Sequence, residues 1–224
     1  GLWFANTITQ PIVELKEIFR RGSEGDLTVR AEVDTADELG ETRSSFNRMM
    51  DTIGTMTYYD PITGLPNRQY FMDYLGTSLN EDPIVILALV SVRGLSELKA
   101  LLGPEVTDDI LIRVAHILKT IGEGDLVVAR IADAEFGVVI PSTSSGVLRI
   151  VDRLDELLSQ PFQIDNRNLQ LRLFGGITIS ELDTPTNAED FYQQAQTALY
   201  EAERNLTEQL KLYNPNTSVP RRRP

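Results

Sequence analysis

The sequence lacks cysteine, has one histidine, and carries far fewer basic than acidic residues. Its 224 residues include no cysteine, which excludes disulfides, cysteine-based zinc sites and thiol catalysis. With His116 as the single histidine, neither a histidine-based metal site nor a catalytic triad is expected. Lys and Arg number 21 against 33 Asp and Glu, a formal charge of -12, so the basic surface that nucleic-acid binding requires is missing. We therefore expect no nucleic-acid partner.

Long hydrophobic runs are missing too, since no apolar stretch reaches the roughly 18 residues that a membrane-spanning helix needs. The chain nonetheless opens with Trp3 and Phe4 ahead of a polar helix. Such an aromatic pair is typical of the interfacial end of a membrane span, and equally of an ordinary helix start. The remaining composition, 42% apolar and 24% charged, is that of a globular protein.

An apolar stripe at helical spacing predicts a first helix. Its residues recur at intervals of four, three and four: Ile8, Ile12, Leu15 and Phe19. Pro11 lies within this stripe, close enough to the expected helix start to be tolerated. Turn residues between Gly22 and Asp26 then end the helix, and an extended stretch containing Leu27 follows.

A second helix is predicted to begin after one of three candidate caps, Asp34, Thr35 or Asp37, with Glu38 in its first turn. Its apolar side follows a heptad pattern: Leu39, Thr42, Phe46, Met49, Ile53 and Met56. Two short helices cannot bury such stripes alone, whereas the four helices of a parallel dimer can.

These two helices resemble a HAMP domain over residues 6–56. The matching blocks occur in order: Ile8-Thr9-Gln10-Pro11-Ile12, Glu14-Leu15, Gly25-Asp26-Leu27, Asp37-Glu38-Leu39-Gly40 and Phe46-Asn47-Arg48-Met49. The resemblance implies a parallel four-helix homodimer that follows a transmembrane helix and relays its movement. A generic dimerising coiled coil is the alternative. The implied dimer core is Ile8, Ile12, Leu15, Phe19, Leu27, Leu39, Phe46, Met49, Ile53 and Met56.

The rest of the chain predicts one α+β domain with a central, mostly antiparallel sheet flanked by helices. A loop from Tyr58 to Asn67 precedes a helix, and the apolar run Ile84 to Val92 predicts a buried central strand. Two hairpins are expected: one joins Val127–Ile131 to Phe136–Ile140, and the other joins Phe162–Ile164 to Leu169–Ile179 around Asp165-Asn166. Helices are predicted at 105–121, 147–158 and 188–205, and Lys211 to Tyr213 are expected to form an edge strand.

This second part resembles the GGDEF domain, the diguanylate cyclase fold, over about residues 58–214. The matching blocks are Asp60-Pro61-Ile62-Thr63-Gly64-Leu65-Pro66-Asn67-Arg68, the hairpin Arg130-Ile131-Ala132-Asp133-Ala134-Glu135-Phe136, and Ala195-Gln196-Thr197-Ala198-Leu199-Tyr200-Glu201-Ala202. Gln160-Pro161-Phe162, with the hairpin ending Gly176-Ile177, resembles the form often fused to an EAL domain. In that family two facing domains each hold one GTP and join the two into cyclic di-GMP.

The resemblance also implies that the catalytic residues are lost. The two carboxylate metal ligands of the family fall on Ser91 and Ala134, so we expect no metal and no cofactor. The glycines that approach the triphosphate fall on Ala132 and Asp133, and the phosphate-binding lysine falls on Glu203. The guanine-reading asparagine falls on Lys99, whereas Asp108 and Glu135 are retained. The stretch Glu123 to Leu126 lacks the family's inhibitory product site.

The other polar candidates have structural interpretations. Arg130 is expected to pair with a nearby carboxylate and brace the hairpin, and His116 is expected to be structural. Tyr192 and Tyr200 are expected to pack rather than to form a ligand platform.

The division expected is the end of a transmembrane helix (1–5), a HAMP relay (6–56), a linker loop (57–66), a degenerate GGDEF domain (67–214) and a tail or linker to a further domain (215–224). We expect the chain to lie on the cytoplasmic side of a bacterial inner membrane. A transmembrane and sensor segment is expected before it and an EAL domain after it. The favoured hypothesis is a non-catalytic relay that regulates this EAL domain. The alternative is a non-catalytic regulator that binds GTP or another nucleotide.

Overall fold

A computed structural model describes residues 2–33, 37–121, 126–142, 146–159, 162–164, 167–180, 186–205 and 208–215. The chain forms two compact units, Gly1–Tyr58 and Tyr59–Pro224, and each is described by itself. In the part of the chain that the structure describes, no helix is both long and apolar enough to cross a membrane. The side chains of residues 2–9, the predicted core residue Ile8 among them, lie outside the described set, as do Asp34, Thr35, Asp165 and Asn166.

The first unit consists of helix α1 (Leu2–Ser23), an extended connector and helix α2 (Glu38–Tyr58). The helix α1 begins earlier than expected, so Pro11 lies in its interior rather than near its start. Of the three candidate caps, Asp37 acts at α2, because its carboxylate accepts a hydrogen bond from the backbone N–H of Gly40 at 3.1 Å. Both predicted helices are therefore present.

The core of the first unit lies between the two helices and the connector. Its buried side chains come from the connector and α2 and are Val29, Ala31, Phe46 and Met50. Partly buried side chains pack against them, namely Leu15, Ile18 and Leu27. The connector is held by Asn47, whose side chain accepts from the N–H of Ala31 at 2.8 Å and donates to its carbonyl at 2.9 Å. Met50 and Ile18 were not among the predicted core residues.

Several predicted dimer-core residues are exposed in the single chain. Ile53 is 38% exposed and Met56 is 77% exposed. Ile12, Phe19 and Met49 are exposed as well. Phe46 differs from them because it is only 3% exposed, inside the unit itself. An apolar stripe along α1 and α2 therefore remains outside the unit's own core.

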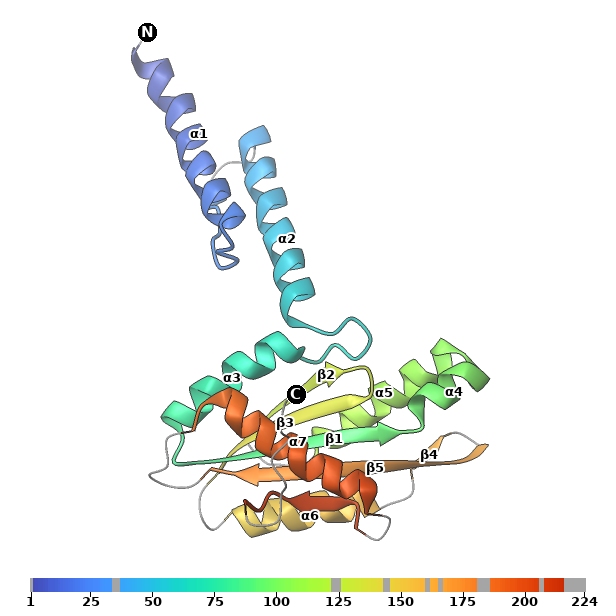
Figure 1. The fold of residues 1–224 in the computed structure, drawn as a ribbon. Coiled ribbons are helices and arrows are strands. Elements are labelled where there is room, and N and C mark those ends of the chain that lie inside the picture. The colour runs from blue at the N-terminus through green and yellow to red at the C-terminus, as the bar shows by residue number, and fades with distance from the viewer. Residues whose placement is uncertain are drawn as a thin grey trace, which may run out of the picture. The chain divides into compact units, whose positions relative to one another are not determined.

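The second unit contains five helices and six strands among its described residues (Figure 1). The elements in chain order are α3 (Arg68–Glu81), β1 (Ile84–Arg93), α4 (Leu95–Leu102), α5 (Pro104–Leu118), β2 (Val127–Ala132), β3 (Glu135–Ser142), α6 (Val147–Ser159), β4 (Phe162–Ile164), β5 (Arg167–Ile179), α7 (Ala188–Arg204) and β6 (Leu210–Leu212). Every helix and strand predicted from the sequence in this unit is present, with shifted ends.

The strands form one sheet in the order β2-β3-β1-β5-β4, with β6 also pairing with β5. Strand β1 pairs antiparallel with β3 on one side and with β5 on the other. The pairs β2–β3 and β4–β5 are antiparallel as well. Strand β6 lies one residue earlier than predicted and runs parallel to β5, so the sheet is mixed. The central position of β1 explains its near-continuous apolar sequence, since helices cover both of its faces.

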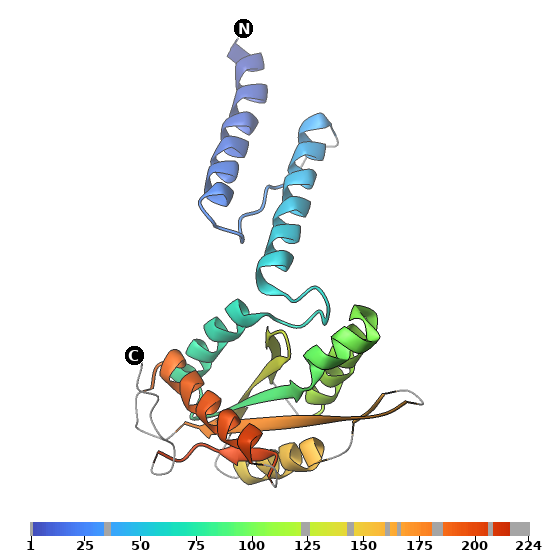
Figure 2. The same ribbon diagram turned by 45° about the vertical axis from the view of Figure 1, so that its right-hand side comes forward.

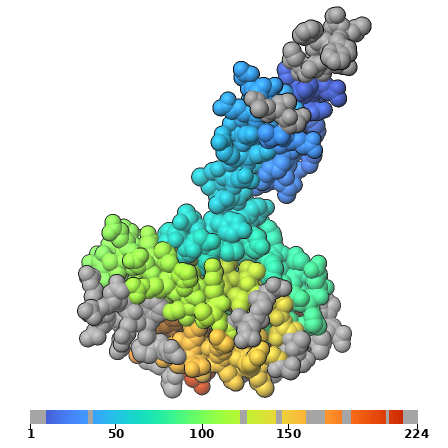
Figure 3. Space-filling model, turned by 180° about the vertical axis from the view of Figure 1, so that it is seen from behind, coloured from blue at the N-terminus to red at the C-terminus, as the bar shows by residue number. Residues whose placement is uncertain are grey.

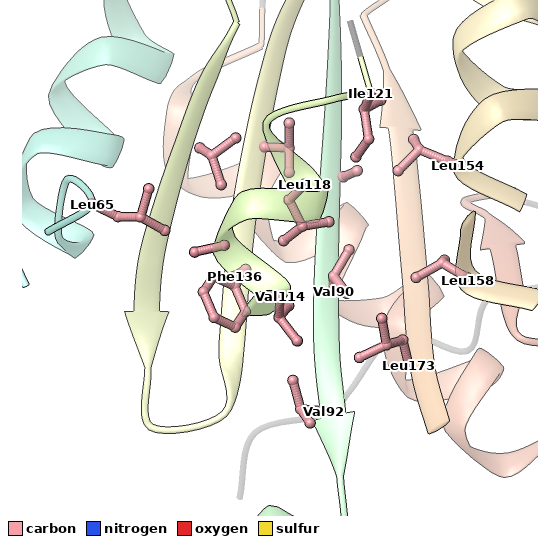
Figure 4. Close-up of a cluster of buried hydrophobic side chains, with 14 of the residues drawn as sticks. Leu65, Val90, Val92, Val114, Leu118, Ile121, Phe136, Leu154, Leu158 and Leu173 are labelled. Carbon is pink, nitrogen blue, oxygen red and sulfur yellow. The ribbon is translucent and has the colours of Figure 1, made fainter. Parts of the chain in front are cut away.

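Helices α3 and α7 cover one face of the sheet, and α4, α5 and α6 lie on the other (Figures 1 and 2). Alternate residues of β1 belong to the two separate cores, with Val90 in one and Leu89 in the other. Figure 4 shows the core beneath α5 and α6, where Phe136 and Val114 lie close to Val90. The view from behind shows α4, α5 and α6 on the surface of that face (Figure 3).

On the opposite face, α7 lies directly on β5 at a glycine. A Cβ added at Gly176 would lie 2.1 Å from the backbone nitrogen of Leu199 and 2.4 Å from the carbonyl oxygen of Ala195. Because both neighbours are backbone atoms of a helix, neither can move aside separately. This contact fixes α7, and the residues on its last turns, above the end of β1.

Candidate functional site

The predicted signature hairpin turns beside the end of the central strand. Strand β1 places Ser91 opposite Glu135 in the β3 ladder. One residue later, the N–H of Val92 donates to the carbonyl of Ala134 at 2.8 Å. The turn residues Ala132 and Asp133 are exposed. The structure thus brings together Ser91 and Ala134, the positions at which the metal ligands are predicted to be lost, at one end of the sheet.

Helix α7 brings a third predicted residue, Glu203, to the same end of the sheet. The hydroxyl of Ser91 donates to Oε1 of Glu203 at 2.6 Å. The guanidinium of Arg93, also at the end of β1, donates to the backbone carbonyl of Glu203 at 2.7 Å. Arg93 was missed in the sequence analysis, because nothing in the sequence relates a residue just after the strand core to a helix 110 residues later.

A second carboxylate lies beside this contact. The hydroxyl of Tyr192 on α7 donates to Oε1 of Glu135 at 3.2 Å and accepts from the side-chain amide of Gln196 at 3.1 Å. Burial raises the pKa of Glu135 and the charge of Glu203 raises it further, while Tyr192 and Arg68 act in the opposite direction. Burial and the charge of Glu135 raise the pKa of Tyr192 to about 12.

An open cleft of about 990 Å³ adjoins the two carboxylates along α7. Glutamates Glu135, Glu201 and Glu203 and one arginine, Arg204, are its charged lining residues. Tyr200 lines it too and is 44% exposed, whereas Tyr192 is buried as predicted. The cleft therefore presents mostly negative charge.

Arg130 braces the hairpin as predicted, and its partner is Asp60. The guanidinium lies 2.9 Å from the Asp60 carboxylate and also donates to the carbonyl of Asp133 at 2.9 Å. Burial opposes ionisation of Asp60, but hydrogen bonds from Thr63 and the charge of Arg130 prevail and lower its pKa. This ion pair ties the loop after Tyr58 to the signature turn.

The remaining predicted residues lie on other elements. Lys99 is exposed on α4 and Asp108 is partly buried on α5. His116 lies on α5 as predicted, but its side chain is exposed, so it does not contribute to the core. Glu123 to Asp125 and Gln160-Pro161 lie outside the described residues.

The donor set does not suit the Mg²⁺ that the GGDEF resemblance implies. Mg²⁺ prefers several hard oxygen ligands in octahedral geometry. The hydroxyl of Ser91 is directed to Glu203, and Ala134 offers only a methyl group. Among the described residues, no group of three or more carboxylate or imidazole side chains could hold a metal ion.

Comparison with protein families agrees with both resemblances. A model of the GGDEF domain, described as diguanylate cyclase, matches residues 57–209, and a model of the HAMP domain matches residues 3–55. The oxygen sensor protein DosP of Escherichia coli is 24% identical over 181 residues, which cover 77% of this chain and 23% of that protein. The diguanylate cyclase TpbB of Pseudomonas aeruginosa is 27% identical over 192 residues, covering 75% of this chain and 43% of that protein. The chain thus spans less than half the length of these relatives.

Solved structures show the same fold. The coiled coil and GGDEF domain of DgcB from Caulobacter crescentus superposes with a TM-score of 0.65 at 18% identity, covering 78% of this chain and 96% of that one. The S helix-GGDEF-EAL segment of LapD from Vibrio cholerae gives 0.63 at 22% identity, covering 79% and 42%. The chain belongs to the GGDEF family of diguanylate cyclase domains, and a HAMP domain precedes its GGDEF domain.

Proposed function

We propose that this chain is a relay in cyclic di-GMP signalling whose GGDEF domain does not make cyclic di-GMP. The observation that carries the proposal is the hydrogen bond between Ser91 and Glu203. At these positions the resemblance places a metal-binding carboxylate and a phosphate-binding lysine. Here the two side chains bind each other, and the second one is an anion.

Electrostatics supports the loss of GTP turnover. A triphosphate in this cleft would meet the like charges of Glu135 and Glu203. Removing one stabilising contact from an active site costs about 10² to 10³ in rate, and here at least three are replaced. Turnover should therefore fall below detection.

The relay role rests on the order of the domains. We propose that the HAMP helices dimerise, because their exposed stripe includes Ile53 and Met56 at heptad spacing. A transmembrane input before the HAMP domain and an EAL output after the GGDEF domain complete the proposed arrangement. The similarity to the S helix-GGDEF-EAL segment of LapD supports the EAL part. The proposed place is the cytoplasmic side of a bacterial inner membrane.

The direct test is incubation of the purified chain with GTP and Mg²⁺, followed by chromatography for cyclic di-GMP. The diguanylate cyclase TpbB serves as the positive control under the same conditions. We expect product from TpbB and none from this chain. Any cyclic di-GMP formed by this chain would overturn the proposed inactivity.

Calorimetry with GTP distinguishes the relay hypothesis from the alternative hypothesis of a nucleotide-binding regulator. We expect no heat of binding, because Asp133 and Glu203 oppose a triphosphate. Tight binding without turnover would instead favour the regulator, with Asp108 as its retained base contact. In that case Asp108→Ala should weaken the binding.

A further inference from the structure

Two bonds from the end of β1 converge on one residue of α7. Ser91 donates to the side chain of Glu203, and Arg93 donates to its backbone carbonyl. Glu203 is the next-to-last residue of α7, where the last carbonyls of a helix have no partner within the helix. Arg93 supplies such a partner from a different element. The last turn of α7 is thus attached to the sheet at two points.

The same turn leads directly to the last strand. Helix α7 ends at Arg204, and β6 begins at Leu210. Strand β6 has three residues, which pair with three residues of β5. Beside this ladder, the N–H of Gly175 donates to the carbonyl of Gln209 and that of Tyr213 to the carbonyl of Ile177, both at 2.7 Å. So short an edge strand has little stability of its own. Because β6 contacts α7 as well as β5, its position depends on both elements.

The position of Glu203 is unfavourable unless its carboxylate has a hydrogen-bond donor. The carboxylates of Glu203 and Glu135 act on each other as like charges in a partly buried place. The Ser91 hydroxyl offsets that repulsion through a short hydrogen bond to a charged acceptor, which is stronger than a neutral one. Without this donor, the repulsion between the two carboxylates is no longer offset, and only the Arg93 bond holds the last turn of α7 at the end of β1.

We propose that Ser91, Arg93 and Glu203 form a latch that holds the last turn of α7, and with it the exit strand β6, against the end of β1. The latch occupies positions that the resemblance assigns to ligand binding, so a contact within the chain replaces a bound ligand. The role of the latch in signalling rests on the proposed relay function, because release of β6 would pass a signal to whatever follows it. The latch itself is a property of the fold.

Hydrogen exchange of the whole chain, measured by mass spectrometry without nucleotide, tests the latch. In Glu203→Ala and in Ser91→Ala we expect about tenfold faster exchange at the amides of Asn205 and Tyr213, because a hydrogen bond to a charged group is lost. The matched control is Glu201→Ala, which removes the same charge from the same turn of α7. Its exchange at these amides should equal that of the unchanged protein.

Two further comparisons make the outcome decisive. Ser91→Thr keeps the hydroxyl and should keep the protection of both amides. The double variant of Ser91→Ala and Glu203→Ala should exchange no faster than the faster single variant, because both changes break one contact. Equal effects of Glu203→Ala and Glu201→Ala, or faster exchange spread evenly over the domain, would overturn the latch.

This experiment is independent of the cyclase test. Cyclic di-GMP formed from GTP would overturn the proposed inactivity and leave the exchange result standing. Unchanged exchange in the latch variants would overturn the latch and leave the inactivity proposal standing.

Discussion

At the scale of single residues, the polar side chains around the signature turn pair with residues far away in the sequence. The sequence analysis predicted that Arg130 pairs with a nearby carboxylate, and the structure shows such a pair, as a nearly buried charge requires. The sequence did not indicate Asp60, which lies 70 residues earlier and reaches Arg130 only through the fold. In the same way Ser91 and Glu203 were each singled out by resemblance, but their hydrogen bond spans 112 residues and follows from the packing of α7 on the sheet.

The Asp60–Arg130 pair should contribute strongly to stability. Its side chains are only 15% and 10% exposed, so an Arg130→Met change leaves a charged carboxylate in a mostly buried place. We expect the free energy of unfolding to fall by about 3 kcal/mol. Urea denaturation measures this change. Arg153→Met on the exposed side of α6 is the control and should stay within about 0.5 kcal/mol of the unchanged protein.

Glu135 should make stability depend on pH. Its folded-state pKa is raised above the ordinary value of 4.5, mainly by burial. The stability that its protonated form provides is complete below that ordinary value and is lost as the pH rises through the folded-state pKa. A Glu135→Gln change removes the ionisation, so the variant should lose less stability than the unchanged protein between pH 4.5 and neutrality. Denaturant midpoints measured across this range check it, and parallel curves for the two proteins would contradict it.

At the scale of elements, the sequence predicted the types of helix and strand well and their partners less well. The apolar run of β1 indicated a strand covered on both faces, and the structure places it in the middle of the sheet. The direction of β6 could not be predicted, because three residues carry no periodicity and the pairing depends on where α7 ends. The early start of α1 was missed because Pro11 was taken to lie near the helix start, although Phe4 and Ala5 extend the apolar spacing found at Ile8.

Gly176 should tolerate no side chain. The Cβ of Gly176→Ala would overlap backbone atoms of Leu199 and Ala195, so α7 would have to move off β5. We expect a loss of about 3 kcal/mol or more in the free energy of unfolding, measured by thermal and urea denaturation. Gly76→Ala is the matched control, because its Cβ meets only the Cβ of Ala188 at 4.0 Å. In the interior of α3 that change should stabilise the protein by up to about 1 kcal/mol.

Asn47 should fix the connector of the first unit. Its amide makes two hydrogen bonds to the backbone of Ala31, and it lies in a block that the HAMP resemblance singled out. An Asn47→Ala change leaves the N–H and carbonyl of Ala31 without these partners, which costs about 1–3 kcal/mol for buried groups. We expect faster hydrogen exchange at Ala31 and reduced stability of this unit. Thr52→Ala on the exposed side of α2 should change neither.

At the scale of the whole molecule, the chain has two units that bury their apolar surface to different extents. The GGDEF domain encloses two cores, one on each face of its sheet. The HAMP unit has one small core and leaves the side chains of Ile12, Met49, Ile53 and Met56 exposed. Contiguous exposed apolar side chains at heptad spacing mark a surface that associates with other helices. A second copy of this chain presents the same stripe, so the proposed symmetric dimer would cover the stripe of both copies at once.

This dimer is best tested at residues outside the unit's own core. Phe46 is unsuitable, because it is buried against Met50 and its ring lies 4.5 Å from that of Phe19, so Phe46→Asp would unfold the unit itself. Ile53→Asp instead places a charge on the exposed stripe. We expect sedimentation equilibrium to show a dimer for the unchanged chain and a monomer for this variant, with helix content kept. Thr52→Asp adds the same charge one residue away, off the heptad positions, and should remain dimeric. A monomeric unchanged chain at high concentration, or a dimer that survives Ile53→Asp, would contradict the parallel arrangement, because a buried charge at two symmetric positions cannot be accommodated in such a core.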